Sequence, residues 1–381
     1  MALTWLEISK SALLNNVSEI KKNLSAKTKF MAVVKANAYG HGLFEVVGSI
    51  KSKVDYLAVY DFKDAVFLSQ GKIIQKITKP ILVLGRILPN QIEVAIKNNI
   101  EVTVSTFDIL ETVKKKSPKK KNEKKLIIHL CLDTGLGRDG FVFAEMEKVL
   151  NLLKNKNLQN NIEVKGLYTH FASADDSAFD SYTKNQVELL LKWKKSLAEI
   201  GLKPLIHTSA SAGTLTNIAP QFDISRIGLS LYGLWPSKEV EIRNKNKTKL
   251  MPVLSWKAII SEVKNMPKGS AISYGCTHIL KRDSKIAVLP IGYYDGIFRC
   301  SSNKGWALVN GQKVPQIGRV TMNLIVLDVT DVKQVKAGDV VTIIGNDKKE
   351  NVTADDLAIW AQTSNYEIVT RINSALTRKI I

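Results

Sequence analysis

The sequence predicts an α/β protein in which a (β/α)8 TIM barrel is followed by a smaller, mainly β C-terminal domain. Short apolar runs alternate with longer amphipathic stretches through the first two-thirds of the chain, and eight such runs can be counted, the number that closes this kind of barrel. After about residue 245 the strand-like runs follow one another without long helices. A length of 381 residues also favours two domains, at roughly 150 residues each.

Each of the eight runs has the length and composition of a parallel strand that is buried on both faces. The amphipathic stretches between them predict helices at residues 11–24, 61–70, 89–98, 107–116, 144–153 and 180–200. A doubly wound open sheet is the alternative arrangement. The predicted strands are residues 30–34, 56–59, 81–84, 101–104, 126–132, 163–168, 204–208 and 223–228.

The C-terminal part begins after a polar linker that ends at Pro252, and Gly and Asn-Gly turns separate its strand-like runs. We expect the barrel to occupy residues 1–245 and the β domain residues 246–381, with residues 1–10 forming a strand that joins the β domain. The strand-like runs are residues 253–263, 285–294, 306–314, 323–329 and 339–345.

The charge is unusual, because 55 Lys and Arg against 35 Asp and Glu give a net +20. Such a balance can serve nucleic acid or an anionic membrane. Eight lysines fall within residues 114–125, but no aromatic residue lies among them for base stacking. We expect a solvated loop at the end of the barrel opposite the catalytic one, and no nucleic-acid partner. A nucleic-acid-binding protein, marked by steep loss of binding with salt, is the alternative from another class.

The number of cysteines and the hydropathy of the chain indicate the cellular compartment in which the protein is expected. The three cysteines, Cys131, Cys276 and Cys300, are too few and too scattered for a disulfide framework or a zinc site, and they fit a reducing compartment. No run approaches the ~20 apolar residues of a spanning helix, and no signal-peptide core follows the N-terminus. We expect a cytoplasmic protein with no membrane partner and no metal.

Residues that can carry chemistry gather where predicted strands end. Lys35 directly follows the first strand, where partial burial would lower its pKa and make it a Schiff-base nucleophile. A lysine that reaches solvent from a strand end is the alternative reading. Barrels place catalysis at this end and commonly bind phosphate beyond strands seven and eight. The other polar residues at these ends are Arg138, His170, His207, Ser211, Arg226 and Gly228.

Several motifs resemble those of alanine racemases, a family of fold-type III enzymes that depend on pyridoxal 5'-phosphate (PLP). The segment Val34-Lys35-Ala-Asn-Ala-Tyr39-Gly-His-Gly42 resembles the PLP-lysine motif, and Ser273-Tyr274-Gly275 resembles the motif of the second base. The resemblance runs in order from Leu3 nearly to the C-terminus. Further similar segments contain His170, Arg226 to Gly228, Gly292 to Gly296, and Gly318 to Met322.

The resemblance implies a head-to-tail homodimer with shared active sites that racemises L- and D-alanine and supplies D-alanine for peptidoglycan. Lys35 would hold PLP and serve as the base on one face of the substrate, and the partner's Tyr274 would serve the other face. A phenol has an unperturbed pKa near ~10, so a network through His170 and Arg226 would stabilise its phenolate form.

The same resemblance assigns the binding roles. Arg226 would also donate to the pyridine nitrogen and thereby suppress transamination, since arginine is only a donor. Arg138 and the backbone N–H of the partner's Met322 would bind the substrate carboxylate, and Tyr293 would line the entry route. His170 would contribute to cofactor binding, and the phosphate would be bound by Tyr39, Ser211, Gly228 and Leu229.

Some positions depart from the family pattern. Cys131 stands where many members have a carbamylated lysine, so we expect no carbamate here and Arg138 held by an anion, water or another acceptor. Asn323 replaces an aspartate and Thr321 a common cysteine, which would relax the exclusion of serine or lysine. Ser374 stands where a tyrosine near the phosphate is sometimes found.

The nearest alternative function is therefore a broad-specificity amino-acid racemase. A barrel-only PLP-binding regulatory protein would lack the second domain and an equivalent of Tyr274. A fold-type III decarboxylase would need a His-Gly-Ser run and a late catalytic cysteine in a matching context, which the sequence does not contain.

Overall fold

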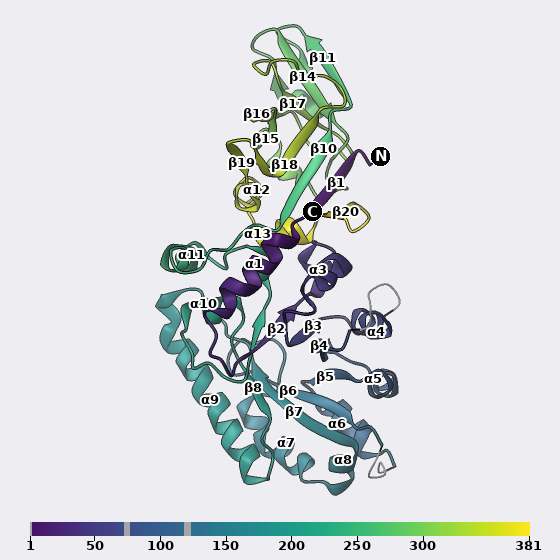
Figure 1. Cartoon of the computed structure of the whole chain (residues 1–381), viewed down its shortest axis with the longest axis vertical. Coiled ribbons are helices and arrows are strands. Elements are labelled where there is room, and N and C mark those ends of the chain that lie inside the picture. Colours follow the sequence, from purple (N-terminus) through teal and green to yellow (C-terminus); the bar gives the residue numbers. More distant parts are fainter. Residues whose placement is uncertain (1, 72–76, 118–122) are drawn as a thin grey trace. The chain divides into compact units, whose positions relative to one another are not determined.

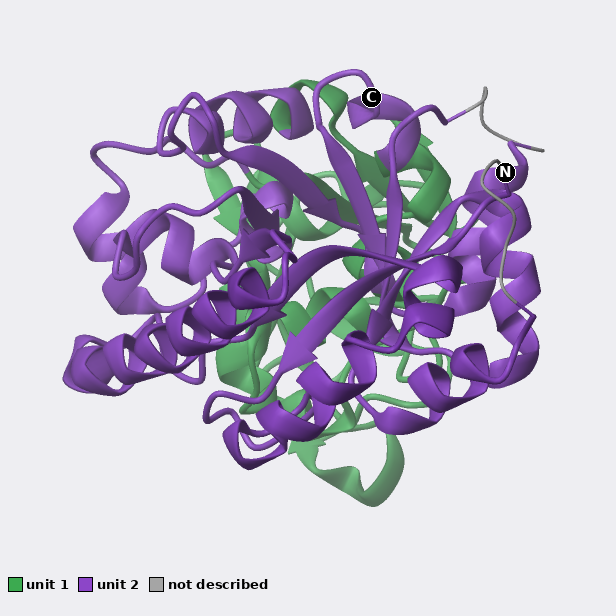
Figure 2. Ribbon diagram, turned by 90° about the horizontal axis from the view of Figure 1, so that it is seen from below, with its two compact units in different colours: residues 1–12, 36–46, 252–381 green, residues 13–35, 47–251 purple. Residues whose placement is uncertain are grey.

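The computed structural model describes residues 2–71, 77–117 and 123–381, and the chain divides into two compact units (Figure 2). Unit 1 consists of Met1–Ala12, Ala36–Val46 and Pro252–Ile381. Unit 2 consists of Leu13–Lys35 and Val47–Met251. Within the part of the chain that is described, no helix combines the length and apolar character needed to cross a bilayer.

Unit 2 holds an eight-stranded parallel sheet in the order β8-β7-β6-β5-β4-β3-β2-β9, rolled into a nearly closed barrel. Between its two end strands, the N–H of Arg226 donates to the carbonyl of Ser209 at 2.9 Å. Each strand overlaps a predicted apolar run, so the predicted barrel is confirmed. The strands are β2 (Lys29–Val33), β3 (Tyr56–Val59), β4 (Ile81–Arg86), β5 (Ile100–Val104), β6 (Leu126–Leu132), β7 (Ile162–Thr169), β8 (Leu205–His207) and β9 (Ile224–Ile227).

Helices lie on the outside of these strands (Figure 2). The lysine-rich segment follows α6, and its residues 118–122 lie outside the described residues, so its predicted loop stays a prediction. The helices are α1 (Lys10–Lys21), α3 (Leu43–Ile50), α4 (Phe62–Gln70), α5 (Ile92–Asn98), α6 (Phe107–Lys114), α7 (Met146–Leu153), α8 (Lys156–Asn161), α9 (Asp180–Glu199), α10 (Ser211–Thr216) and α11 (Lys238–Asn244).

Unit 1 is mainly β, as expected for the C-terminal part. Its large sheet, whose strands are labelled in Figure 1, has the order β11-β14-β17-β16-β15-β18-β10-β1-β20, with β19 paired to β18. Strands β12 and β13 form a separate pair. The strands are β1 (Thr4–Ile8), β10 (Leu254–Ile259), β11 (Glu262–Met266), β12 (Ala271–Ile272), β13 (His278–Ile279), β14 (Ser284–Leu289), β15 (Trp306–Val309), β16 (Gln312–Ile317), β17 (Ile325–Asp328), β18 (Val340–Asp347), β19 (Glu350–Val352) and β20 (Thr377–Ile380).

The first residues of the chain form strand β1, which belongs to the large sheet of unit 1. It runs antiparallel to β10 and parallel to β20, so the N-terminal strand lies between two strands of the C-terminal segment. Leu6 and Ile8 on this strand are fully buried. Two helices that the sequence pattern did not predict complete the unit, α12 (Ala354–Ala361) and α13 (Asn365–Thr370). Helix α12 begins with a capping box, in which Thr353 and Asp356 exchange hydrogen bonds.

Candidate active site

In unit 2 the candidate residues lie at or beyond the C-terminal ends of the strands. Lys35 follows β2, Arg138 follows β6, His170 follows β7 and Ser211 follows β8, while Arg226 is in β9 itself. Because the strands are parallel, these ends meet on one rim, which is where this fold carries its active sites. The charges of Lys35, Arg138 and Arg226 all act on His170, so these four groups lie close together.

Lys35 is a partly buried amine with cationic neighbours. Burial lowers its pKa below the ordinary value, and the charges of Arg138 and Arg226 lower it further. No hydrogen-bond or ion-pair partner for its Nζ occurs in the ranges that the structure describes. A lysine in such surroundings exposes a larger neutral, nucleophilic fraction, which is the requirement for bonding to a carbonyl carbon.

Arg226 is 4% exposed and is hydrogen-bonded through both terminal nitrogens. NH1 donates to the carbonyl of His207 at 2.6 Å and to its Nδ1 at 3.0 Å. NH2 donates to the carbonyls of Thr169 and Thr208 at 2.8 and 2.9 Å and to Nδ1 of His170 at 3.2 Å. The Nε–H donates to no atom of the described residues, so it remains available to a ligand.

His170 accepts a hydrogen bond from Arg226 at Nδ1, so that nitrogen carries no proton. Arginine can only donate, so Nδ1 of His170 accepts and the ring proton resides on Nε2. Burial, followed by the charges of Arg226, Arg138 and Lys35, lowers the pKa of His170 to about 3. The Nε2–H of this imidazole can thus donate to an anionic oxygen at neutral pH.

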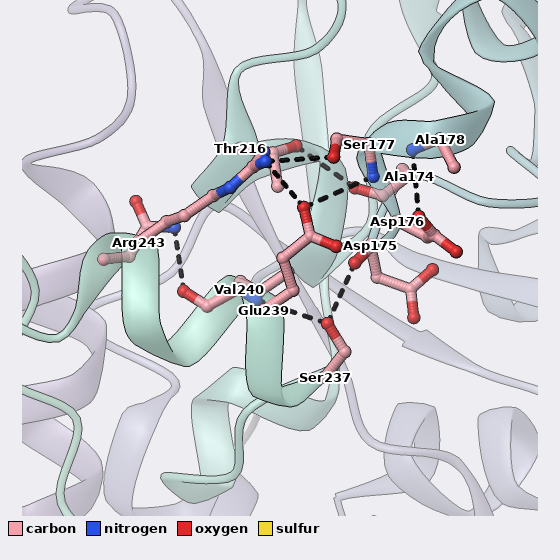
Figure 3. A network of polar contacts seen from close by, with 11 residues as sticks. Ala174, Asp175, Asp176, Ser177, Ala178, Thr216, Ser237, Glu239, Val240 and Arg243 are labelled. Atoms are coloured by element: carbon pink, nitrogen blue, oxygen red, sulfur yellow. Dashed lines mark hydrogen bonds and ion pairs between the residues drawn. The ribbon is translucent and has the colours of Figure 1, made fainter.

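The loop that follows His170 is tied to α10 and α11 (Figure 3). Arg243 on α11 donates to the Ser177 hydroxyl at 2.9 Å and pairs with Glu239 at 2.8 Å. The Ser237 hydroxyl donates to the carbonyl of Asp175 at 2.9 Å, and Figure 3 shows these contacts side by side. Anchoring a rim loop at several points restricts its motion near the strand ends.

Beyond β8 and β9 the chain presents hydroxyls and N–H groups suited to an oxyanion. The Ser211 hydroxyl accepts from the N–H groups of Gly228 and Ser230 at 3.2 Å each. The buried hydroxyls of Thr208, Thr214 and Ser230 have no partner among the described residues. Phosphate oxygens accept readily from such donors, and barrels commonly bind phosphate after these two strands. The N–H of Leu229 likewise has no partner in the described ranges.

The loop that carries Arg138 is held by a carboxylate. Asp133 accepts from the N–H groups of Gly135 and Gly137 at 2.9 and 3.1 Å and from that of Arg138 at 3.1 Å. Burial raises the pKa of Asp133, but these backbone donors outweigh burial and lower it overall. The arginine side chain itself is mostly exposed and lies 3.6 Å from Asp139.

Cys131 on β6 is buried, and burial raises the pKa of its thiol to about 11. The thiol donates to the carbonyl of Asp139 at 3.5 Å. At neutral pH it is un-ionised and supplies no negative charge to Arg138. Among the acceptors expected for Arg138, the structure provides Asp139.

Tyr39 lies in unit 1, in a turn with unusual backbone geometry. Ala36, Asn37, Ala38 and Tyr39 have φ values of 52°, 53°, 53° and 53°, one turn of left-handed helix made without glycine. Such geometry costs roughly 1–2 kcal/mol per residue. The turn is held by Arg378, whose Nε donates to the carbonyl of Gly40 at 2.8 Å. Burial raises the pKa of Tyr39 to about 12.

The remaining candidates belong to unit 1 and are exposed. Tyr274 is 74% exposed and Met322 is 55% exposed. The N–H of Tyr293 donates to the carbonyl of Thr321 at 2.9 Å, which brings Tyr293 beside the segment that carries Met322. The N–H of Met322 donates to nothing in the described part of the chain. Asn323, next in sequence, is also exposed.

Sequence reasoning missed two polar residues inside the barrel and left His207 among the general strand-end candidates. Glu101 on β5 and His129 on β6 are 2% and 0% exposed, and the chain His207–His129–Glu101 extends inward from Arg226. The signal that could have found them is the presence of a glutamate and a histidine within two of the predicted buried strands. Tyr168 stacks on His207 with the ring centroids 4.7 Å apart.

Comparisons with known proteins cover both units. Residues 8–236 match the family model described as alanine racemase, N-terminal domain, and residues 253–380 match alanine racemase, C-terminal domain. An alanine racemase of Methanococcus maripaludis is 39% identical over 376 residues, which is 98% of this chain and 97% of the relative. One of Halothermothrix orenii is 38% identical over 378 residues, covering 99% and 96%.

Solved structures agree with the sequence matches. The alanine racemase of Bacillus anthracis with bound L-Ala-P has a TM-score of 0.89 at 34% identity, covering 100% of this chain and 95% of that one. The enzyme of Streptomyces lavendulae has a TM-score of 0.90 at 29% identity, covering 100% and 97%. The chain therefore belongs to the alanine racemase family.

Proposed function

We propose that the chain is a cytoplasmic, PLP-dependent alanine racemase that works as a homodimer and supplies D-alanine for peptidoglycan. The observation that carries this proposal is the cationic rim of the barrel, where Lys35, Arg138 and Arg226 lie together beside buried hydroxyls with no partner in the described ranges. PLP and an amino acid are both anionic, and PLP offers an aldehyde that a lysine can capture.

The described residues fit PLP. Lys35 would hold the aldehyde carbon, Arg226 would donate its Nε–H to the pyridine nitrogen, and His170 would lie beside the ring. Tyr39, Ser211, Gly228 and Leu229 would hold the phosphate, and the hydroxyls left without a partner near Ser211 support that role. When bound, PLP supplies a π-system that delocalises the electrons left on the α-carbon after its proton is removed.

Racemisation requires a proton to leave one face of the α-carbon and a proton to arrive on the other. Lys35, with its pKa lowered by burial and by two arginines, would exchange the proton on one face. The partner's Tyr274 would exchange it on the other. The neutral His170 would donate from Nε2 to the phenolate oxygen and keep it anionic.

Substrate binding would use a guanidinium and a backbone donor. Arg138 and the N–H of the partner's Met322 would hold the substrate carboxylate, and Tyr293 would line the entry route. The sequence supports a second function, a broad-specificity racemase, because Asn323 and Thr321 flank Met322 and no carboxylate stands at either position. Serine or lysine turnover that rivals alanine turnover would select the second function.

The direct test incubates the purified protein with PLP and L-alanine and separates the products on a chiral column. Appearance of D-alanine, and of L-alanine from D-alanine, is the expected result. A protein that shows the visible absorbance of lysine-bound PLP but converts no alanine would refute the substrate assignment while keeping the cofactor. Serine and lysine are assayed in parallel to separate the two functions.

A further inference from the structure

The barrel interior contains a continuous chain of hydrogen bonds that ends at Arg226. NH1 of Arg226 donates to Nδ1 of His207 at 3.0 Å. Nε2 of His207 lies 2.9 Å from Nδ1 of His129, and Nε2 of His129 lies 2.8 Å from Glu101. Lys165 pairs with the other carboxylate oxygen of Glu101 at 2.5 Å. Four neighbouring strands, β5 to β8, and β9 contribute these residues.

The direction of every hydrogen bond in this chain follows from its two ends. Arginine can only donate, so Nδ1 of His207 must accept and its proton must reside on Nε2. His207 then donates to Nδ1 of His129, which places the proton of His129 on Nε2, facing Glu101. An ionised carboxylate only accepts, so the two ends require the same arrangement. Both imidazoles are thereby fixed as neutral Nε2–H tautomers.

The two ends of this series of hydrogen bonds, Arg226 and Glu101, also carry opposite charges. No carboxylate lies within ion-pair distance of Arg226 in the described ranges, although the guanidinium is 4% exposed. A buried charge without a counter-ion is costly. Burial raises the pKa of Glu101, but His129 and Lys165 outweigh burial and hold it below the ordinary value, so Glu101 is an anion. Burial, followed by the charge of Arg226, holds the pKa of His207 well below its ordinary value.

The backbone provides room for this chain. A Cβ on Gly166 of β7 would lie 1.9 Å from Nδ1 of His129, closer than any real contact. The glycine is thus needed for space at the point where His129 accepts from His207. This steric requirement is independent of the hydrogen bonds and supports the same placement of the imidazole.

We propose that Glu101, His129 and His207 are positioning residues that act through Arg226. Their one-directional chain of hydrogen bonds aims the guanidinium and leaves its Nε–H for the ligand. Hydrogen bonds aligned in one direction polarise one another, so loss of the negative charge of Glu101 should weaken the hydrogen bond between His207 and Arg226. This role rests on the proposed function, in which Arg226 donates to the pyridine nitrogen and limits transamination.

The first test needs neither cofactor nor mutation. The chain has five histidines, so nitrogen NMR of histidine-labelled protein can resolve each ring. His129 and His207 should each show one protonated nitrogen, Nε2, and one bare nitrogen, Nδ1, at neutral pH. Either ring found protonated on Nδ1 would overturn the proposal, whatever reaction the enzyme catalyses.

The second test uses the enzyme with PLP bound and measures how its turnover divides between racemisation and transamination. Glu101→Gln keeps the volume of the side chain and removes its charge, and Gly166→Ala displaces His129 while keeping every polar group. Each should lower the racemisation rate about tenfold or more, as loss of an outer hydrogen-bond partner does elsewhere, and raise pyruvate formed per D-alanine formed. The matched control is Glu163→Gln on the exposed part of β7.

The outcomes separate the two proposals. If the unmodified enzyme forms no D-alanine, the proposed function fails. The NMR test still decides whether the hydrogen bonds from Arg226 to Glu101 run in the direction that we propose. If the unmodified enzyme racemises alanine and Glu101→Gln leaves both the rate and the pyruvate ratio unchanged, the positioning role is wrong. A lower rate with an unchanged pyruvate ratio would indicate a purely structural role and would also overturn it.

Discussion

The two units present their candidate residues in opposite ways. In the barrel of unit 2, Arg226 is 4% exposed and fully engaged through its terminal nitrogens, and His170 and Lys35 have pKa values lowered by burial and neighbouring charge. In unit 1, Tyr274 is 74% exposed and Met322 is 55% exposed, and both lie outside the strands.

On the proposed function, this difference would divide the work of catalysis between the two units. The barrel residues are organised within one chain, since buried hydrogen bonds fix the orientation of Arg226 and His170. The residues of unit 1 that we assign to the reaction are large side chains or N–H groups open to solvent, and on the proposed function they would gain a defined environment when covered. A second copy of the chain is the partner that the proposed function supplies.

The largest effect is expected from the barrel half. On the proposed function, Lys35→Ala would remove both the group that holds PLP and one base, so activity should fall by at least about 10³-fold. The visible absorbance of lysine-bound PLP should vanish at the same time. The check is an absorbance spectrum of the variant mixed with PLP. Retention of that band would remove Lys35 from its role.

A smaller loss is expected from the exposed half. Tyr274→Phe deletes one phenol oxygen, so turnover should fall about 10²- to 10⁴-fold, the usual contribution of a general base. PLP should stay bound, because the barrel residues are untouched. Tyr294→Phe, at another exposed tyrosine of unit 1, is the matched control. Unchanged rates in both directions would exclude Tyr274 as the second base.

Acid should destabilise the barrel through its neutral histidines. The folded pKa of His170 is about 3, and that of His207 is also lowered, whereas an unfolded histidine titrates near ~6.5. As pH falls below ~6.5 the unfolded chain binds protons that the folded chain does not, so stability falls. Each such histidine should cost about 1 kcal/mol between pH 7 and 5.5.

Denaturant unfolding at these two pH values measures this effect. His170→Gln should reduce the acid-dependent loss of unfolding free energy by about 1 kcal/mol. His278→Gln, in β13 of unit 1, is the control. If His170→Gln leaves the pH dependence unchanged, His170 is not held neutral in the folded protein.

The smallest effect concerns Cys131. Burial holds its thiol un-ionised, whereas Cys300 is exposed, so a thiol-alkylating reagent should modify Cys300 in the native protein and spare Cys131. Mass spectrometry of peptides reads this out. Carbon NMR in labelled bicarbonate should show no carbamate, and a carbamate signal on any lysine beside Arg138 would contradict our view of this position.

The barrel was predictable because its strands are buried on both faces, so each one is a nearly unbroken apolar run such as Tyr56–Val59. Helix α13 was missed because its 6 residues are too few to show a clear period. Helix α12, with 8 residues, is as long as the predicted α6 and α7, and it was missed because it follows a series of strand-like runs. The left-handed turn at Ala36–Tyr39 could not be predicted, since no glycine marks it and a contact from Arg378, distant in sequence, holds it.

The rim residues were predictable because parallel strands bring their ends together, so a residue after each run belongs to one surface. The series of hydrogen bonds that connects Arg226 to Glu101 through two histidines was not predictable. Which strands face one another across a barrel interior depends on the closed geometry, and no spacing along the sequence links His129 to His207. The sequence likewise gave no sign that the carbonyl of Asp139 accepts a hydrogen bond from the Cys131 thiol.

We propose that a complete site combines the barrel of one chain with Tyr274 of another. The measurement mixes Lys35→Ala and Tyr274→Phe proteins in equal amounts, allows the subunits to exchange, and assays D-alanine formation. Each mixed dimer would contain one intact site, and half of the dimers would be mixed, so activity should recover to about a quarter of the unmodified enzyme. No recovery, with exchange confirmed by tagged subunits, would contradict a site shared between chains.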